Sequence, residues 1–170
     1  MNKILMLGCS GGGKSTISNQ LFNILNIPVL HLDIFYWKEN WVATQTDEWR
    51  EIVKDLLKKD QWIMDGTFSS TFDLRFPEAD LIVVLKRPRL LCLYRAITRL
   101  LKYDKVKRRL DMAQGCEEKF DLDFYKYIWN FNKVHYPRIE TAINQYECHD
   151  KLVLLETQKD IDLFLESLTV

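Results

Sequence analysis

Cysteine, glycine and proline are scarce in this 170-residue sequence, which has four cysteines, six glycines and four prolines. The cysteines form no Cys-x-x-Cys pair and no regular spacing, so neither a zinc site nor a disulfide framework is indicated, and a reduced cytoplasmic setting is expected. No apolar run approaches the ~18 residues of a membrane span, and we expect no membrane partner. Net charge is lacking too, since 24 basic residues balance 24 acidic ones. A zero net charge argues against a surface that attracts nucleic acid or membrane as a whole.

The apolar content points to a single folded domain. Hydrophobic residues make up 47% of the chain and aromatic residues 12%, which excludes a disordered protein and predicts one domain over residues 1–170. Short apolar runs alternate with helical patterns, which is typical of βαβ units and predicts a doubly wound α/β fold with a parallel sheet. The expected strands are Ile4–Leu7, Val29–Leu32, Trp62–Met64, Leu81–Leu85 and Leu152–Leu155.

Longer amphipathic patterns separate the expected strands. The predicted helices cover residues 14–26, 46–59, 88–103, 121–146 and 159–168. Pro137 should kink or divide the long fourth helix, because proline cannot donate a backbone hydrogen bond inside a helix. The charged stretch from about Asp104 to Glu118 has weak apolar periodicity, and we interpret it as an excursion from the core that could act as a lid.

The strongest motif is a glycine-rich loop that matches G-x-x-x-x-G-K-[ST] and lies between the first expected strand and the first expected helix. Glycines let consecutive N–H groups converge on phosphate oxygens, Lys14 adds a positive charge for the β- and γ-phosphates, and the Ser15 hydroxyl is suited to Mg²⁺. The residues expected to bind the nucleotide are Gly8, Ser10, Gly11, Gly12, Gly13, Lys14, Ser15 and Thr16.

Other classes with this loop are excluded by motifs that the chain does not have. A GTPase would show Asn-Lys-x-Asp, and the nearest string, Asn132–His135, lacks the aspartate. An ABC-type ATPase would be longer and carry its own signature. A small nucleotide-dependent kinase is left, together with a nucleotide-binding protein that has lost its chemistry.

Two aspartates follow expected strands, at the edge where open α/β folds bind ligands. Asp65 is expected near Mg²⁺, with a turn cap as the alternative. Asp33 could accept the proton of an attacking hydroxyl, bind a cation or cap the next segment, and these readings stay open. We expect His31 to be a hydrogen-bonded interior histidine rather than a catalyst.

Aromatic residues cluster after Asp33, at Phe35, Tyr36, Trp37 and Trp41. They could stack on a planar base beside an acceptor site or form a loop core, and the second reading is slightly favoured. Trp49 and Trp62 are assigned to the core.

Positive charge is concentrated between Lys86 and Arg109, a segment that contains ten basic residues and one acidic residue. The rest of the chain therefore carries nine negative charges. Arg95 and Arg99 lie four residues apart, on one helix face, and Arg109 falls in the excursion. A lid that brings arginines onto phosphates explains this segment best, and a nucleic-acid contact or a solvated face are the alternatives.

The chain resembles adenylate-kinase-like P-loop small-molecule kinases and, more narrowly, bacterial topology-modulation proteins. The narrower resemblance extends from the first strand to about Arg138. It rests on His31–Asp33 with Tyr36–Lys38 and Trp41, Trp62–Gly66, Ala79–Leu81, Arg87–Arg89 with Leu91–Leu93, and Asp111–Cys116.

This resemblance implies a three-layer P-loop fold with a five-stranded parallel sheet in the order 2-3-1-4-5 and a short helical lid before the last strand. It implies that Arg95 stacks on adenine and that Arg99 reaches a phosphate. Asp33 is similar in position to the acceptor-side aspartate of shikimate- and gluconate-type kinases. The segment after the second strand departs from true adenylate kinases, which argues against AMP as the acceptor.

The first hypothesis is an enzyme that transfers the γ-phosphoryl group of ATP to a small molecule, with a nucleotide or nucleoside as a candidate. Lys14, Asp33, Arg99 and Arg109 would be catalytic, and Ser15 with Asp65 would hold Mg²⁺. The alternative is an ATP-binding regulator that contacts DNA through its basic segment with little or no kinase activity. The sequence leaves open whether the protein is a monomer or a homodimer.

Overall fold

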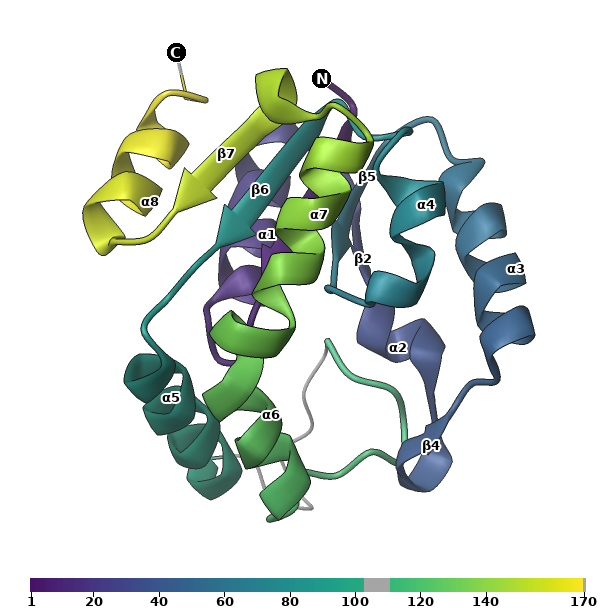
Figure 1. Cartoon of the computed structure of the whole chain (residues 1–170), viewed down its shortest axis with the longest axis vertical. Coiled ribbons are helices and arrows are strands. Elements are labelled where there is room, and N and C mark those ends of the chain that lie inside the picture. Colours follow the sequence, from purple (N-terminus) through teal and green to yellow (C-terminus); the bar gives the residue numbers. More distant parts are fainter. Residues whose placement is uncertain (103–110, 170) are drawn as a thin grey trace.

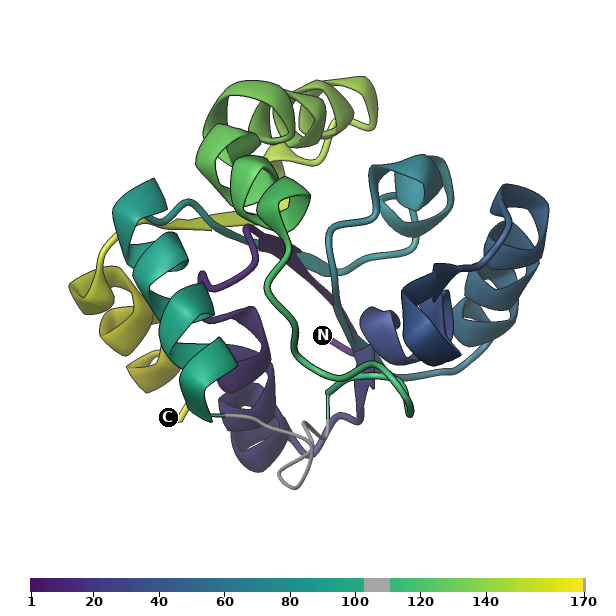
Figure 2. The same cartoon turned by 90° about the horizontal axis from the view of Figure 1, so that it is seen from below.

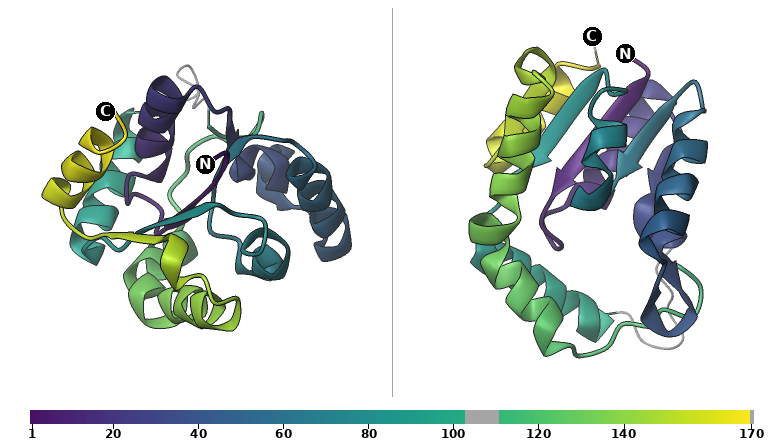
Figure 3. Two further views of the ribbon diagram at one scale, coloured as in Figure 1. Left: turned by 90° about the horizontal axis from the view of Figure 1, so that it is seen from above. Right: turned by 45° about the vertical axis from the view of Figure 1, so that its right-hand side comes forward.

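Five short strands form one parallel sheet in the computed structural model, which describes residues 1–102 and 111–169 (Figure 1). The strands are β1 (Lys3–Gly8), β2 (Val29–His31), β5 (Trp62–Asp65), β6 (Leu81–Leu85) and β7 (Leu152–Leu155). Their order across the sheet is β2-β5-β1-β6-β7. Counted along the chain, these five strands have the predicted order 2-3-1-4-5. The arrows run side by side in one direction in the right panel of Figure 3.

The sheet separates two apolar cores because its strands are apolar on both faces. Ile4 and Met6 of β1 point to the face covered by α1 and α8, whereas Leu5 and Leu7 point to the opposite face. Figure 2 shows α6 and α7 in green on one side of the sheet, and α1 and α8 in purple and yellow on the other. Trp49 and Trp62 are both buried in the larger core, as predicted.

The longer helices begin and end close to the predicted positions. They are α1 (Lys14–Leu25), α3 (Thr46–Leu57), α5 (Arg89–Lys102), α6 (Leu122–Val134), α7 (Tyr136–Gln145) and α8 (Gln158–Glu166). Pro137 lies in the first turn of α7 and, as expected, divides the predicted long helix in two. Asp121 caps α6, since its carboxylate accepts hydrogen bonds from the backbone N–H groups of Asp123 and Phe124.

Short elements between β2 and β6 were not predicted. They are the helices α2 (Leu32–Tyr36) and α4 (Phe72–Arg75), the 3-10 helices Glu39–Trp41 and Ser69–Thr71, and the strands β3 (Trp37–Lys38) and β4 (Val42–Ala43). A further 3-10 helix, His149–Lys151, precedes β7 and was not predicted either. β3 and β4 pair as a small antiparallel ribbon. With two residues per strand, neither has enough residues to show a periodicity.

The described end of the excursion, residues 111–118, forms turns and irregular chain that continues to residue 121, and the rest of the predicted lid lies outside the described residues. The backbone of residues 111–121 is held by the ribbon segment. The Asn40 N–H donates to the Gly115 carbonyl at 3.1 Å, and the Trp41 indole N–H donates to the Glu117 carbonyl at 2.8 Å. The green segment in Figure 1 accordingly crosses the open end of the sheet to reach β4.

No helix in the described ranges combines the length and the apolar character that a membrane crossing requires.

Candidate active site

The glycine-rich loop leaves β1 at the centre of the sheet and enters α1 through residues in the left-handed region. Gly11 has φ 76° and Gly13 has φ 106°, conformations that glycine adopts most readily. A Cβ atom at Gly11 would also collide with the backbone carbonyl of Cys92 in α5. The loop therefore depends on glycine for its conformation and for its close contact with α5.

The start of α1 is open to an anion. Gly13 is the N-cap, no side chain caps the helix, and its first turn contains no acidic residue. The first N–H groups thus remain available, and the positive end of the helix dipole faces the loop. The Lys14 ammonium donates to the Cys9 carbonyl at 3.0 Å, and Arg95 reaches the Gly12 carbonyl at 3.4 Å. Two cations consequently flank the loop.

Asp65 ends β5 beside β2 and is only 5% exposed. Its Oδ2 lies 2.9 Å from Nδ1 of His31, the residue paired with it in the sheet register. This contact supports the expectation of a hydrogen-bonded interior histidine. Burial opposes protonation of His31, but the hydrogen bond to Asp65 and the charges of nearby aspartates outweigh it and raise its pKa.

Ser15 and the second Asp65 oxygen suit a small divalent cation. Neither the Ser15 hydroxyl nor Asp65 Oδ1 has a hydrogen-bond partner among residues 1–102 and 111–169, and both residues line the same cavity. In these ranges no cluster of three or more His, Cys, Asp or Glu side chains could hold a metal alone. Two protein groups are nevertheless sufficient for Mg²⁺ that is also bound by phosphates and water.

Asp33 lies in α2 rather than at a strand end, because β2 stops at His31. Its carboxylate accepts a hydrogen bond from the Trp37 indole N–H, one helical turn later, at 3.2 Å. This bond orients Asp33 toward the loop, and Asp33 lines both cavities described next. Asp33 thus follows β2, as expected, as the second residue of a short helix that was not predicted.

Two cavities meet above the carboxyl edge of the sheet. The first, here called the P-loop cavity, has a volume of about 400 Å³ and is lined by Ser10 to Ile17 with Asp65, Arg95 and Asp111. The second, here called the aromatic cavity, has a volume of about 580 Å³. Four residues line both cavities, namely Ser10, Lys14, Asp33 and Arg99. A group bound in one cavity therefore adjoins a group bound in the other.

Rings from two parts of the chain line the aromatic cavity. One wall contains Tyr36, Trp37, Trp41 and Phe68, which form a continuous series of ring contacts with centroids 4.6 to 5.5 Å apart. The other wall comes from α6. The sequence analysis slightly favoured a loop core for the aromatic cluster. Phe35 and Tyr36 do pack against the larger core, and Tyr36, Trp37 and Trp41 also line this cavity.

The α6 wall consists of Phe124 and Tyr127. Their rings are nearly parallel, at 18°, and Tyr127 also contacts His135 at 4.7 Å. Burial raises the pKa of Tyr127 and keeps its hydroxyl protonated, so Tyr127 can donate a hydrogen bond into the cavity. The two walls together enclose a space suited to a flat ligand.

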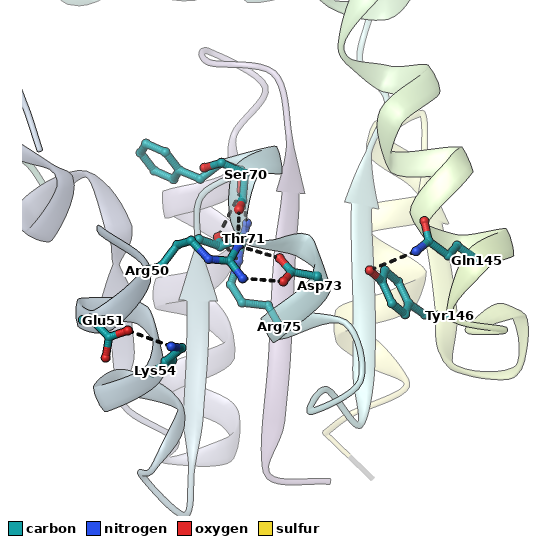
Figure 4. Close-up of polar contacts among 10 residues, drawn as sticks. Arg50, Glu51, Lys54, Ser70, Thr71, Asp73, Arg75, Gln145 and Tyr146 are labelled. Carbon is teal, nitrogen blue, oxygen red and sulfur yellow. Dashed lines mark hydrogen bonds and ion pairs between the residues drawn. The ribbon is translucent and has the colours of Figure 1, made fainter. Parts of the chain in front are cut away.

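A buried arginine holds the loop that forms the floor of the aromatic cavity. Arg75 is fully buried and donates to the carbonyls of Gly66, Thr67 and Phe68, at 2.6 to 2.9 Å, and to the Thr71 hydroxyl at 3.0 Å. Figure 4 shows Arg75 reaching Thr71. The carbonyl groups of this loop are therefore held from inside the core.

Arg50 holds the outer side of the same loop. It forms a bidentate pair with Asp73, at 2.6 and 3.0 Å, and donates to the Ser70 carbonyl (Figure 4). The Thr67 hydroxyl links the loop to the start of the glycine-rich loop, because it donates to the Gly8 carbonyl and accepts from the Gly8 N–H. The floor of the aromatic cavity is thus tied to the P-loop.

The described part of the basic segment places Arg99 at the junction of the cavities. Its guanidinium forms an ion pair with Glu118 at 3.0 Å and lies 5.7 Å above the Phe124 ring. Arg109 and its neighbour Arg108 lie outside the described residues, so their predicted contribution as lid arginines stays a prediction. The same holds for the alternative of DNA binding through these residues.

Several cavity residues were missed at the sequence level. Thr67, Phe68, Tyr127 and Arg138 belong to no motif and lie inside apparently ordinary loop or helix patterns, as does Arg75, which supports the cavity floor from the core. They come together only through the packing of α6 and α7 over the sheet. The one available signal was the Asp65-Gly66 pair, which predicts a loop at this edge without showing which side chains face the cavity.

Comparison with solved structures gives the same fold. A shikimate kinase from Acinetobacter baumannii, in complex with shikimate, matches 99% of this chain and 91% of its own, with a TM-score of 0.62 and 14% identity. A deoxyadenosine kinase from M. mycoides, with the products dCMP and dCDP bound, matches 98% of both chains, with a TM-score of 0.52 and 14% identity.

The architecture is therefore that of P-loop kinases of the adenylate-kinase-like type. At 14% identity the likeness establishes the fold alone. No protein-family model and no curated protein matches the sequence. The narrower resemblance to topology-modulation proteins gains no support from these comparisons.

Proposed function

We propose that this protein is an ATP-dependent phosphotransferase that transfers the γ-phosphoryl group of ATP to a small-molecule acceptor. The observation that carries the proposal is the pair of adjoining cavities that share Ser10, Lys14, Asp33 and Arg99. One cavity has the chemistry of a triphosphate site and the other has the size and lining of a small-molecule site. A hydroxyl group in the aromatic cavity would thus face the end of a triphosphate.

The residues at the junction supply the functions that in-line transfer requires. An oxygen of the acceptor attacks the γ-phosphorus while the bond from that phosphorus to the β–γ bridging oxygen breaks, and ADP leaves. Asp33 is placed to accept the proton of the attacking hydroxyl, with its orientation fixed by Trp37. Lys14 and Arg99 stabilise the charge on the transferring group, and Arg95 contacts the loop that binds the nucleotide.

Ser15 and Asp65 would hold Mg²⁺, which neutralises phosphate charge when bound. His31 keeps Asp65 in place through its hydrogen bond to Oδ2. Arg109 is included in the proposal as a lid residue on the basis of the sequence alone.

The solved structures suggest what kind of acceptor to test. One was determined with shikimate and the other with deoxycytidine nucleotides, so small hydroxylated compounds and nucleosides or nucleotides form the first panel. The aromatic walls favour the nucleosides and nucleotides, whose flat bases stack on rings.

Titration of the protein with a non-hydrolysable ATP analogue in the presence of Mg²⁺ tests the nucleotide site. Lys14→Ala should abolish tight binding, whereas Lys133→Ala, which removes an exposed lysine of α6 away from both cavities, should not change it. ADP release with each acceptor, measured with and without enzyme, then tests transfer. Equal analogue binding by wild type and Lys14→Ala, or no acceptor-dependent ADP release across the panel, would contradict the proposal.

A further inference from the structure

Two cysteines meet between the glycine-rich loop and α5, and the proposed reaction uses neither of them. Cys9 is the second residue of the loop, Cys92 lies in the first turn of α5, and both are buried in the larger core. The loop rests directly on α5, because a Cβ atom at Gly11 would collide with the Cys92 carbonyl and lie 3.2 Å from the Cys92 Cα. The two thiols form a hydrogen bond across this contact. Their sulfur atoms are therefore within reach of each other without a large movement of the chain.

The other two cysteines make different contacts. All four belong to the described residues, and all four are free thiols. The Cys116 thiol donates to the Lys38 carbonyl at 3.2 Å, and the Cys148 thiol donates to the Tyr146 carbonyl at 3.2 Å. Among the four, Cys9 and Cys92 thus form the pair that is placed for a disulfide.

The surroundings favour a thiolate on Cys92 and a thiol on Cys9. The hydrogen bond from Cys9 is the main cause that lowers the pKa of Cys92, to about 7, and nearby positive charges add to it against the opposing effect of burial. These charges belong to Lys14, Arg95 and Arg87. The same hydrogen bond, followed by burial, raises the pKa of Cys9. Because the thiolate is the nucleophilic form, Cys92 should react first and Cys9 second.

The backbone of Cys9 organises the phosphate-binding loop. Its carbonyl accepts hydrogen bonds from the Gly12 N–H at 3.1 Å and from the Lys14 ammonium at 3.0 Å. A disulfide brings two sulfur atoms closer than a hydrogen bond does, so its formation would draw Cys9 toward α5. The loop has no room to follow as a rigid unit, because not even a methyl group fits between Gly11 and the Cys92 carbonyl. The displacement would therefore move the Cys9 carbonyl and the groups that it holds.

The P-loop cavity gives a small oxidant a route toward this pair. Ser10, which follows Cys9, lines the cavity, and so does Arg95, one helical turn after Cys92. The two thiols thus lie close behind the cavity wall. A nucleotide bound in the cavity would cover this approach.

From this arrangement we propose that Cys9 and Cys92 form a reversible disulfide when the protein meets a peroxide, and that this disulfide weakens nucleotide binding. The second half of the proposal rests on the proposed function, to which it adds redox control of the nucleotide site.

The chemistry proceeds in two balanced steps. The Cys92 thiolate attacks one oxygen of hydrogen peroxide, so that an S–O bond forms, the O–O bond breaks, and hydroxide leaves with the bonding electron pair. Hydroxide takes the proton of Cys9 and becomes water. The Cys9 thiolate then attacks the Cys92 sulfur, the S–S bond forms, and the S–O bond breaks to release a second hydroxide. The two sulfurs lose two electrons, and the peroxide gains them.

Treatment of the reduced full chain with hydrogen peroxide tests bond formation. The protein is then alkylated with N-ethylmaleimide in denaturant and its intact mass is measured. Reduced protein carries four alkyl groups, one for each cysteine. Oxidised protein should carry two and regain four after dithiothreitol, and peptide mapping should assign the bond to Cys9 and Cys92. Cys92→Ala should abolish the bond, whereas Cys148→Ala, which removes a buried cysteine elsewhere in the core, should retain it.

Titration with a non-hydrolysable ATP analogue and Mg²⁺ tests the effect on binding. Oxidation of wild type should weaken the analogue roughly tenfold to a hundredfold, as expected for the loss of one charge-assisted hydrogen bond to phosphate, and dithiothreitol should restore its affinity. Cys92→Ala should bind the analogue as tightly as reduced wild type, and peroxide should not change this. Saturating analogue should slow disulfide formation in wild type.

Four results would overturn the inference: uptake of four alkyl groups after peroxide, a bond to another cysteine, unchanged analogue affinity of the disulfide form, or an equal loss of affinity in peroxide-treated Cys92→Ala. Failure of the analogue to bind reduced wild type would instead contradict the proposed function, and the alkyl count would still decide whether the disulfide forms. Thermal unfolding shows whether each variant is folded, and Cys92→Ser serves as the second variant at this position.

Discussion

Replacement of Arg75 by methionine should destabilise the fold markedly, although no acidic side chain in residues 1–102 and 111–169 lies within hydrogen-bond distance of Arg75. The guanidinium is fully buried and donates four hydrogen bonds, to three carbonyls and one hydroxyl. Burial lowers its pKa, but a guanidinium is still protonated at neutral pH. Methionine keeps much of the volume and removes every donor.

The size of the effect follows from two opposing contributions. Hydrogen bonds from a charged donor contribute about 1.5–3 kcal/mol each, so the loss of all four would remove roughly 6–12 kcal/mol. Burial of the cation costs several kcal/mol, and the variant no longer incurs this cost. We therefore expect the free energy of unfolding to fall by about 3–4 kcal/mol, which corresponds to a decrease of ~10 °C in the melting temperature of a chain of this size.

Urea unfolding followed by circular dichroism measures this difference directly. Arg50→Met is the matched control, because it removes an arginine that holds the same loop from its solvent-exposed side, and it should destabilise the fold less. The reasoning is refuted if the two variants lose equal stability or if Arg75→Met loses less than about 1 kcal/mol. A folded Arg75→Met protein should also bind acceptors less tightly while its affinity for ATP analogues is retained, since the loop lines only the aromatic cavity.

Three further changes test other parts of the structure. Gly11→Ala should lower stability by about 1–3 kcal/mol and weaken binding of ATP analogues, because alanine is strained at φ 76° and collides with the Cys92 carbonyl; unchanged analogue titrations would contradict this. Trp37→Phe removes the hydrogen bond that orients Asp33 and should reduce kcat roughly tenfold with little change in the KM for ATP, as steady-state kinetics can show. The backbone N–H groups of Asn2 and Lys3 donate hydrogen bonds to the Asp80 carboxylate and lower its pKa in the folded state. The ionised carboxylate therefore stabilises the fold fully above the pKa of the unfolded chain, about 4, and this stabilisation is lost as the pH falls through the lower pKa of the folded chain. Urea midpoints should therefore decline more steeply below about pH 4 in wild type than in Asp80→Asn, and parallel curves would argue against this assignment.

The sheet and the phosphate-binding loop could be predicted from the sequence because both depend on local patterns. Leu81 to Leu85 is apolar on both faces, which is the property of a strand covered on two sides. Pro137 marks a helix boundary by its own covalent structure. Gly11 and Gly13 supply the conformations that the loop needs at fixed spacing.

The second cavity could not be predicted because its walls come together only in the folded chain. Phe68 and Tyr127 are separated by nearly sixty residues and come to line one cavity only through the packing of α6 over the sheet. The helix that contains Asp33 was also missed, since a five-residue helix such as α2 leaves no periodic signal. The burial of Arg75 could not be predicted from the hydropathy of the sequence, because arginine is strongly polar and is usually exposed.

The tie between the ribbon and residues 111–121 has a consequence for how the protein could be re-engineered. The contacts at Asn40 and Trp41 join two segments that insert on different sides of the central strand, and neither segment belongs to the glycine-rich loop. The two segments form a module that can be exchanged as a unit, because hydrogen bonds join them to each other. Exchanging both segments together between proteins of this architecture should transfer acceptor preference. Exchanging either one alone should leave the carbonyl groups of Gly115 and Glu117, or the N–H groups that donate to them, without their hydrogen-bond partners.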